Sequence, residues 1–178
     1  MDPAILTVTE LVDGLRAGAA GSYPVEAATE LLIRHWSWLA RPEFLRACTR
    51  ALDDDPELRL AVDWSTVEMH VTTADAPPSE RAVAVIAAQL GQRPDQTASP
   101  PRPTSSLGLP LGFLLTCLER RDVDMVLAAI SHSAGTQDHV EHVGEPNATG
   151  EWRPTSTSPR LRLGPLHPWP EPALPGLD

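Results

Sequence analysis

The sequence predicts an all-α fold, a small bundle of about six short helices, and three observations lead to this prediction. Apolar residues recur at three- and four-residue spacing through most of residues 1–135. Helix-start signals, in which a hydroxyl residue precedes a glutamate by three positions, stand before two of these stretches. Alternation of apolar and polar residues, which is typical of strands, is confined to one short stretch. The length of 178 residues suits a single domain.

Proline content divides the chain. Residues 136–178 contain 8 of the 19 prolines and few apolar residues. They cannot bury enough surface to offset the entropy of ordering them, so we expect a disordered tail. Residues 92–106 contain four prolines and one apolar residue, which predicts a Pro-rich linker or insertion. The remaining segments are a helical main part, 1–91, and a C-terminal helical hairpin, 107–135, that packs on it.

The first two helices have clear beginnings. Thr7 and Glu10 match a capping box, in which each side chain bonds the other residue's backbone amide, and Gly18 is expected to end this helix. Pro24 fits the first turn of the second helix. The apolar stripe of that helix has helical spacing and is formed by Val25, Ala28, Leu32, Trp36 and Leu39.

In the next stretch the spacing of apolar residues changes from helical to alternating. A third helix is predicted from Pro42 to a point before Pro56, with an apolar face of Leu45, Cys48 and Leu52. Apolar and polar residues then alternate over residues 58–64, which indicates a short strand. Because no partner strand is apparent, an extended connection explains the pattern equally well.

Two further helices complete the main part. Ser65 and Glu68 match a second capping box, which predicts a short helix to about Thr72. Ser79 is expected to cap a helix that ends at Gly91.

The C-terminal hairpin is predicted to contain two helices. The first, residues 109–118, is apolar nearly all round, so we expect it to be buried. The second is capped by Asp122 and ends at Gly135. Arg120 and Arg121 then lie in the turn between the two helices, near the carbonyl end of the first.

Composition excludes several classes of function. A formal charge of −10 disfavours general nucleic-acid binding, because phosphate attraction supplies most non-specific affinity. All 14 basic residues are arginine, which excludes Schiff-base chemistry and a P-loop lysine. No apolar run is long enough for a membrane span, and the first residues lack the basic region of a secretory signal. Cys48 and Cys117 are therefore interpreted as reduced thiols of a cytoplasmic protein.

Motifs with known chemistry are sparse. No nucleotide-binding, metalloprotease or serine-hydrolase motif is present, so we assign no catalytic residue and expect no cofactor. The densest polar cluster contains His132, His139 and His142, whose side chains are zinc or nickel ligands in other proteins. A solvated polar run is the simpler interpretation, because the cluster enters the predicted tail and lacks the packing that fixes metal ligands. A small metal-dependent enzyme is therefore one alternative function.

A second alternative is a DNA-associated transcriptional accessory protein. Arg120 and Arg121 are its candidate phosphate contacts. The predicted helix that follows begins with Asp122 and Asp124 and contains no arginine, and this acidic start disfavours contact with phosphate.

The favoured function is a non-enzymatic protein–protein interaction or accessory protein, which binds another protein or a second copy of itself. Trp36 and Trp38 cannot share one helix face, so Trp38 lies either beneath another helix or exposed on a partner surface. Residues 109–118 add to that surface if part of the helix is exposed, because a small domain has little room to bury an all-apolar helix. Trp169 stands between two prolines, in a stretch that resembles a polyproline ligand.

Three segments also share a pattern with known proteins: Asp63-Trp64, Ser79-Glu80-Arg81-Ala82-Val83 with Ile86-Ala87-Ala88, and Leu118-Glu119-Arg120-Arg121-Asp122-Val123 with Ala128-Ala129-Ile130, His132, Ala134 and Gly135. This pattern resembles a family of small uncharacterised helical proteins from high-GC Gram-positive bacteria. The resemblance implies a helical fold and no established activity, so no catalytic residue comes with it. The 92–106 insertion departs from the pattern, in which a shorter link joins the two C-terminal helices.

Overall fold

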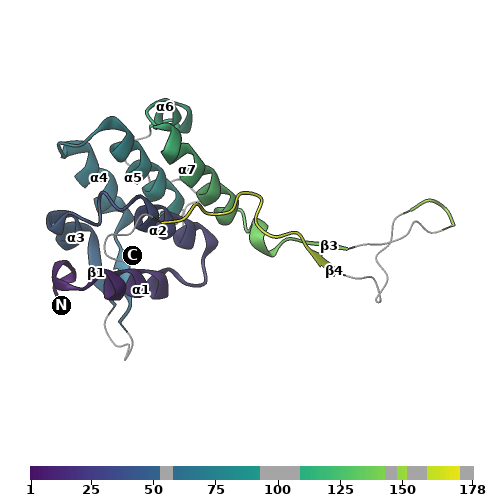
Figure 1. Cartoon of the computed structure of the whole chain (residues 1–178), viewed down its shortest axis with the longest axis horizontal. Coiled ribbons are helices and arrows are strands. Elements are labelled where there is room, and N and C mark those ends of the chain that lie inside the picture. Colours follow the sequence, from purple (N-terminus) through teal and green to yellow (C-terminus); the bar gives the residue numbers. More distant parts are fainter. Residues whose placement is uncertain (53–57, 93–108, 143–147, 152–159, 173–178) are drawn as a thin grey trace, which may run out of the picture.

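A computed structural model of the chain describes residues 1–52, 58–92, 109–142, 148–151 and 160–172. In these residues most of the fold is formed by seven α-helices (Figure 1): α1 (Val8–Ala19), α2 (Tyr23–His35), α3 (Pro42–Cys48), α4 (Trp64–Thr73), α5 (Pro78–Gly91), α6 (Leu111–Thr116) and α7 (Arg120–Ser133). Two 3-10 turns and two pairs of three-residue strands complete the described elements. The predicted all-α class is right in its main feature. None of these helices has the length and apolar content needed to span a bilayer.

Helix α2 is the centre of the bundle, since α1, α5 and α7 all pack against it. It contributes fully buried residues on more than one side, namely Ala27, Ala28, Leu31, Leu32 and Ile33. Helix α5 is buried throughout residues 82–88, and most of these residues are alanine or valine. Small side chains let neighbouring helix axes approach closely, so α2, α5 and α7 form the compact layer that positions the surface features described below.

Helix α1 begins as predicted and ends later than predicted. The Thr7 hydroxyl accepts a bond from the Glu10 amide at 3.3 Å, and the Glu10 carboxylate accepts one from the Thr7 amide at 2.9 Å. Gly18 does not end the helix, which continues to Ala19. The glycine allows a close approach instead, because a Cβ at this position would lie 2.0 Å from the carbonyl oxygen of Leu60.

Helix α2 is shorter than its apolar stripe predicts. Trp36 adopts a left-handed backbone conformation with φ of 64°, which ends the helix at His35. The chain turns there, and both Trp38 and Leu39 enter the core from the turn. The predicted stripe to Leu39 is therefore wrong, because a helix end replaces its last turn.

The predicted third helix ends early because its last residues form a strand. Helix α3 stops at Cys48, and β1 (Thr49–Ala51) pairs antiparallel with β2 (Leu60–Val62), with Arg50 opposite Ala61. The strand suggested within residues 58–64 is thus present at its centre. The sequence pattern predicts a helix for its partner strand β1, because local spacing does not reveal pairing with residues further along the chain. The acidic residues 53–57 lie outside the described residues.

The starts of α4 and α5 also differ from the predicted caps. The carboxylate of Asp63, rather than the Ser65 hydroxyl, caps α4 by accepting from the Thr66 amide at 3.1 Å. Glu68 is wholly buried and accepts a bond from Gln92 at 3.1 Å, so it is not part of a surface capping box. Helix α5 begins at Pro78, and the predicted cap Ser79 lies inside it.

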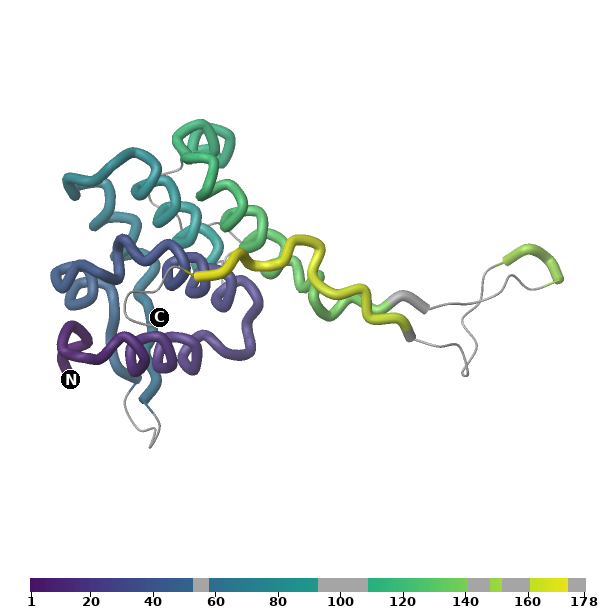
Figure 2. Tube along the Cα trace, viewed as in Figure 1, coloured from purple at the N-terminus to yellow at the C-terminus, as the bar shows by residue number. Residues whose placement is uncertain are grey.

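The predicted disorder of residues 136–178 is not confirmed for the parts that the structure describes. After η2 (Thr136–Asp138), β3 (Val140–His142) pairs antiparallel with β4 (Arg160–Arg162) in an arm that extends from the bundle. Figure 2 shows the chain returning along this arm and then lying over the helices as its yellow C-terminal part. Within the 92–106 insertion, Gln92 is described, and residues 93–106 lie outside the described residues.

Candidate functional site

The outer face of α7 is apolar, although it faces solvent. Val123, Leu127 and Ile130 are 36%, 38% and 39% exposed. Their spacing of four and then three residues places them on one side of the helix. The opposite side contacts the core through Met125, Val126, Ala128 and Ala129, which are buried. Helix α7 is therefore apolar on both sides, with one side unpartnered among the described residues.

Helix α6 adds to this exposed apolar surface, which corrects the prediction of a buried helix for residues 109–118. Leu114 is buried, whereas Leu111, Phe113 and Leu115 are 44%, 56% and 42% exposed. The helix packs against α5 at the edge of the bundle (Figure 1), so one side of it has a neighbour. We call the exposed residues of the two helices the α6–α7 face: Leu111, Phe113, Leu115, Val123, Leu127 and Ile130.

The arginine pair lies at the start of α7 beside acidic groups. Both Arg120 and Arg121 are exposed first-turn residues. The Arg121 Nε lies 3.5 Å from Glu119 and 3.4 Å from the buried carboxylate of Asp122. Asp122 is inside the first turn and does not cap the helix, whose N-cap is Glu119. The positive charge at this point is therefore locally compensated.

Trp38 is not part of an exposed surface, so it does not belong to the α6–α7 face as the interaction hypothesis expected. Its ring is 1% exposed and lies 5.4 Å from the ring of Phe44. The indole Nε1 donates to the carbonyl oxygen of Glu80 at 2.8 Å, and the guanidinium of Arg41 stacks over the ring at 4.3 Å. A buried tryptophan with a satisfied N–H is a packing residue.

A buried polar cluster lies where α2, α5 and α7 meet. The Ser79 hydroxyl donates to one carboxylate oxygen of Asp122 at 2.9 Å. The other oxygen lies 3.7 Å from Nε2 of His35, whose side chain is 2% exposed. Burial lowers the pKa of His35, and the nearby Asp122 opposes this shift. Serine, aspartate and histidine meet here, but the serine donates to the aspartate rather than to the imidazole, so this arrangement does not activate a nucleophile.

The two thiols occupy different environments. Cys48 is buried, and burial together with Asp63 raises its pKa to about 12. It is a thiol rather than a thiolate near neutral pH, as expected for a packing residue. Cys117 is partly exposed beside α6, and both cysteines are free.

The histidines suggested as metal ligands do not form a site among the described residues. His132 lies 3.1 Å from the carboxylate of Glu26 on α2. His139 lies between η2 and β3, and the side chain of His142 lies outside the described residues. Within the described part of the chain, no group of three or more histidine, cysteine or acidic side chains is arranged to hold a metal ion.

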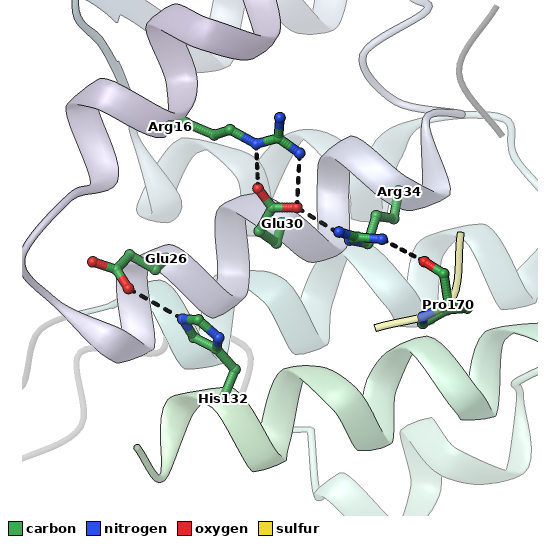
Figure 3. A network of polar contacts seen from close by, with 6 residues as sticks. All are labelled: Arg16, Glu26, Glu30, Arg34, His132 and Pro170. Carbon is green, nitrogen blue, oxygen red and sulfur yellow. Dashed lines mark hydrogen bonds and ion pairs between the residues drawn. The ribbon is translucent and has the colours of Figure 1, made fainter. Parts of the chain in front are cut away.

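His132 instead belongs to a polar network on α1, α2 and α7 (Figure 3). Glu30 lies between two arginines, accepting from Arg16 on α1 and from Arg34 on its own helix at 3.1 Å. A pocket of about 220 Å³ lies beside these residues and is lined by α1, α2 and His132. Glu30 is paired with two guanidinium groups and Glu26 contacts His132, so the network orders this surface.

The C-terminal segment attaches to the same surface, as Figure 3 shows at Pro170. Arg34 donates to the Pro170 carbonyl oxygen, and its guanidinium lies 5.1 Å from the ring centroid of Trp169. The ring of His132 lies 6.1 Å from the same tryptophan ring, tilted by 50°. The sequence marked Trp169 as a polyproline-type ligand, but it contained no signal for Arg34, which lies 136 positions before Pro170.

The comparisons add no relative to this description. No family model, no curated protein and no solved structure matches the chain. The fold and the surfaces above therefore stand on the chain's own residues.

Proposed function

We propose that the protein is a non-enzymatic, cytoplasmic interaction or accessory protein that self-associates through its α6–α7 face. The observation that supports this proposal is the exposed aliphatic stripe of α7. Monomeric soluble proteins rarely leave contiguous apolar patches uncovered, and such patches are typical of protein-binding surfaces. The two free cysteines are consistent with a reducing compartment.

A second copy is the partner that fits this stripe. Val123, Leu127, Ile130 and Ala134 follow a four–three–four spacing, which is the spacing of a helix–helix seam. In an antiparallel pair with its twofold axis near Leu127, Val123 of one copy faces Ile130 of the other, so the stripe is complementary to itself. Arg120 then lies beside the carbonyl end of the other α7, where the helix dipole favours a positive charge.

Charge and size decide how strong this pairing is. The molecule has a formal charge of −10, but the exposed part of α7 includes Arg120, Arg121 and one acid, Asp124, so this helix does not add to the repulsion between copies. A single helix pair buries less than the roughly 1,200 Å² of a stable interface, so Leu111 and Leu115 must contribute. A three-residue turn joins α6 to α7, and the proposal requires that these two leucines lie within the same interface. We therefore expect a reversible dimer of micromolar affinity.

Sedimentation of the full chain tests the proposal. From about 5 to about 500 µM, a range set by transient interfaces, the weight-average mass should rise toward that of a dimer. Leu127→Glu places two carboxylates at the twofold axis and should weaken association at least about tenfold. Met69→Glu is the matched control, since Met69 is 57% exposed on α4, a helix that contributes no residue to the face. A monomer at every concentration, or equal effects of the two substitutions, would contradict self-association.

The two alternatives find less support among the described residues. For DNA binding, Arg121 already lies near Glu119 and Asp122, and phosphate would have to displace these acids. For a metal-dependent enzyme, His132 faces Glu26 rather than a second and third ligand. Neither arrangement favours its alternative over the interaction proposal.

A further inference from the structure

Residues 163–170, which we call the strap, form a second interaction that is independent of the α6–α7 face. The strap leaves the β3–β4 arm and lies over the C-terminal end of α7 and along α2 (Figure 2). We propose that the surface beneath it is a recognition site for an extended segment that contains a tryptophan between two prolines. The strap occupies this site as an intramolecular ligand, and a segment of the same kind from another chain can replace it.

The strap is held first through its backbone. The amide of Leu163 donates to the His139 carbonyl oxygen at 3.2 Å. The amide of Leu166 donates to the Thr136 hydroxyl at 3.3 Å, and that of His167 donates to the Ser131 hydroxyl at 3.1 Å. These bonds fix a segment that bends at Leu166 and His167, and they do so without reading its side chains, as in other modes of peptide recognition.

Selectivity comes from Trp169. Its ring packs partly buried against the core, near both the Arg34 guanidinium and the His132 ring. A guanidinium over an indole face is a favourable cation–π pair. Pro168 and Pro170 keep the backbone extended and offer no N–H that would need a partner. The Pro170 carbonyl accepts from Arg34, so one arginine contacts both the ring and the backbone of the ligand.

The site is held in shape by contacts that do not involve the strap. Glu30 holds Arg34 at 3.1 Å and is itself held by Arg16 from α1. The Ser131 and Thr136 hydroxyls lie 2.6 Å apart and bond each other. A site whose groups are already positioned loses little entropy when a ligand binds, so it can accept a replacement for the strap.

The rest of the strap is weakly attached, which makes exchange feasible. Leu163 and Leu166 are 56% and 73% exposed, so these two leucines bury little surface on the helices. The strap therefore depends on Trp169 and a few hydrogen bonds, several of them at the surface. Interactions of this strength are overcome by a competing segment at moderate concentration.

Peptide binding to the full chain tests the proposal. The probe is a fluorescein-labelled peptide with the sequence of residues 160–172, and the readout is fluorescence anisotropy. Trp169→Ala releases the strap, and this variant should bind the peptide saturably. The wild-type chain should bind it at least about tenfold more weakly, because its own strap competes at millimolar effective concentration. A peptide with alanine in place of its tryptophan should not bind.

Matched arginine variants separate recognition from general surface effects. In the Trp169→Ala background, Arg34→Gln should weaken peptide binding about tenfold or more, because both contacts to the ligand are lost. Arg46→Gln removes an arginine that pairs with Asp2 and takes part in none of the contacts that hold the site or the strap, so it should retain most of the binding. Circular dichroism and thermal unfolding confirm that each variant is folded.

Two outcomes would overturn the proposal: absence of saturable binding to folded Trp169→Ala chain, or binding that Arg34→Gln leaves unchanged. Equal affinity of the wild-type chain and Trp169→Ala would overturn the intramolecular-ligand part. Leu127→Glu keeps this test separate from self-association, since the double variant Leu127→Glu/Trp169→Ala should bind the peptide as Trp169→Ala does.

Discussion

His35 and Asp122 are an unusual pair for a helical core. Neither ring nitrogen of His35 has a hydrogen-bond partner among the described residues, and one oxygen of Asp122 also has none. Leaving buried polar atoms unpaired costs free energy, and protonating the ring would add a buried charge. The ring is held neutral by its burial, against the attraction of Asp122, and its pKa is lowered accordingly.

The buried pair of His35 and Asp122 predicts that the protein becomes less stable as pH falls. Above the pKa of an unfolded histidine, about 6.5, both states hold a neutral ring. As pH falls below that value, the unfolded chain takes up a proton that the folded chain resists. The free energy of unfolding should therefore fall, by up to about 1.4 kcal/mol per pH unit from this residue. The fall should continue until pH reaches the lowered pKa of the folded state.

His35→Leu should remove this part of the pH dependence. Urea unfolding of the wild type and the variant at pH 7 and pH 5 measures this part of the pH dependence, because the carboxylates that also titrate are the same in both proteins. The loss of stability between the two pH values should be smaller in the variant. An unchanged loss would mean that His35 takes up its proton as readily in the folded protein as in the unfolded chain.

At the scale of elements, the contact between α1 and β2 depends on a glycine. A Cβ at Gly18 would meet the backbone carbonyl of Leu60 at 2.0 Å, and backbone atoms cannot yield as a flexible side chain can. Gly18→Ala should therefore destabilise the protein by about 1–3 kcal/mol or more, as overpacking does. Thermal unfolding measures the change.

Gly112 provides the control for that substitution. It lies inside α6, and a Cβ there would meet nothing within 4 Å. Gly112→Ala should stabilise the protein by about 0.5–1 kcal/mol through helix propensity. If both alanines lowered the unfolding temperature equally, the close contact at Gly18 would not explain the effect.

Elements with purely local signals were predicted well from the sequence. The capping box at Thr7 and the first-turn proline of α2 are present where expected. Some errors are local, such as the cap of α4 at Asp63 rather than Ser65, and others fall where a distant partner decides the local structure. Thr49 leaves a helical pattern to pair with Val62, and Ser79 lies inside α5, where its hydroxyl bonds Asp122. Spacing along one segment contains no information about such partners.

At the scale of the whole molecule, the bundle is complete without the strap. Among the described residues, Trp169 is the one apolar residue beyond position 135 that packs against the core. A chain that stops after His142 should therefore keep its helical circular dichroism and unfold cooperatively. Its free energy of unfolding should be lower by about 1–3 kcal/mol, which is the contribution of a half-buried tryptophan and a few surface hydrogen bonds.

Trp169→Ala in the full chain should lower the free energy of unfolding by most of the amount that the shortened chain loses, as measured by urea unfolding. Loss of cooperative unfolding in the shortened chain would contradict this account, because it would show that the bundle needs its C-terminal segment.

The candidate surfaces were only partly predictable, because contacts with distant parts of the chain decide which side chains are exposed. An apolar helix at 109–118 was identified correctly as apolar, but its exposure depends on α6 lying at the edge of the bundle, which the pattern does not specify. A helix that continued past Trp36 would point Trp38 away from it, which left Trp38 either beneath another helix or on a partner surface. The helix ends at Trp36 instead, and the turn brings Trp38 into the core.

The contact between Arg34 and Pro170 spans 136 positions of the chain, and this separation sets the order in which the protein is built. Closing so long a loop costs more entropy than any local contact, so the strap is attached late in folding. Until the strap closes, each folding molecule therefore presents its tryptophan site open.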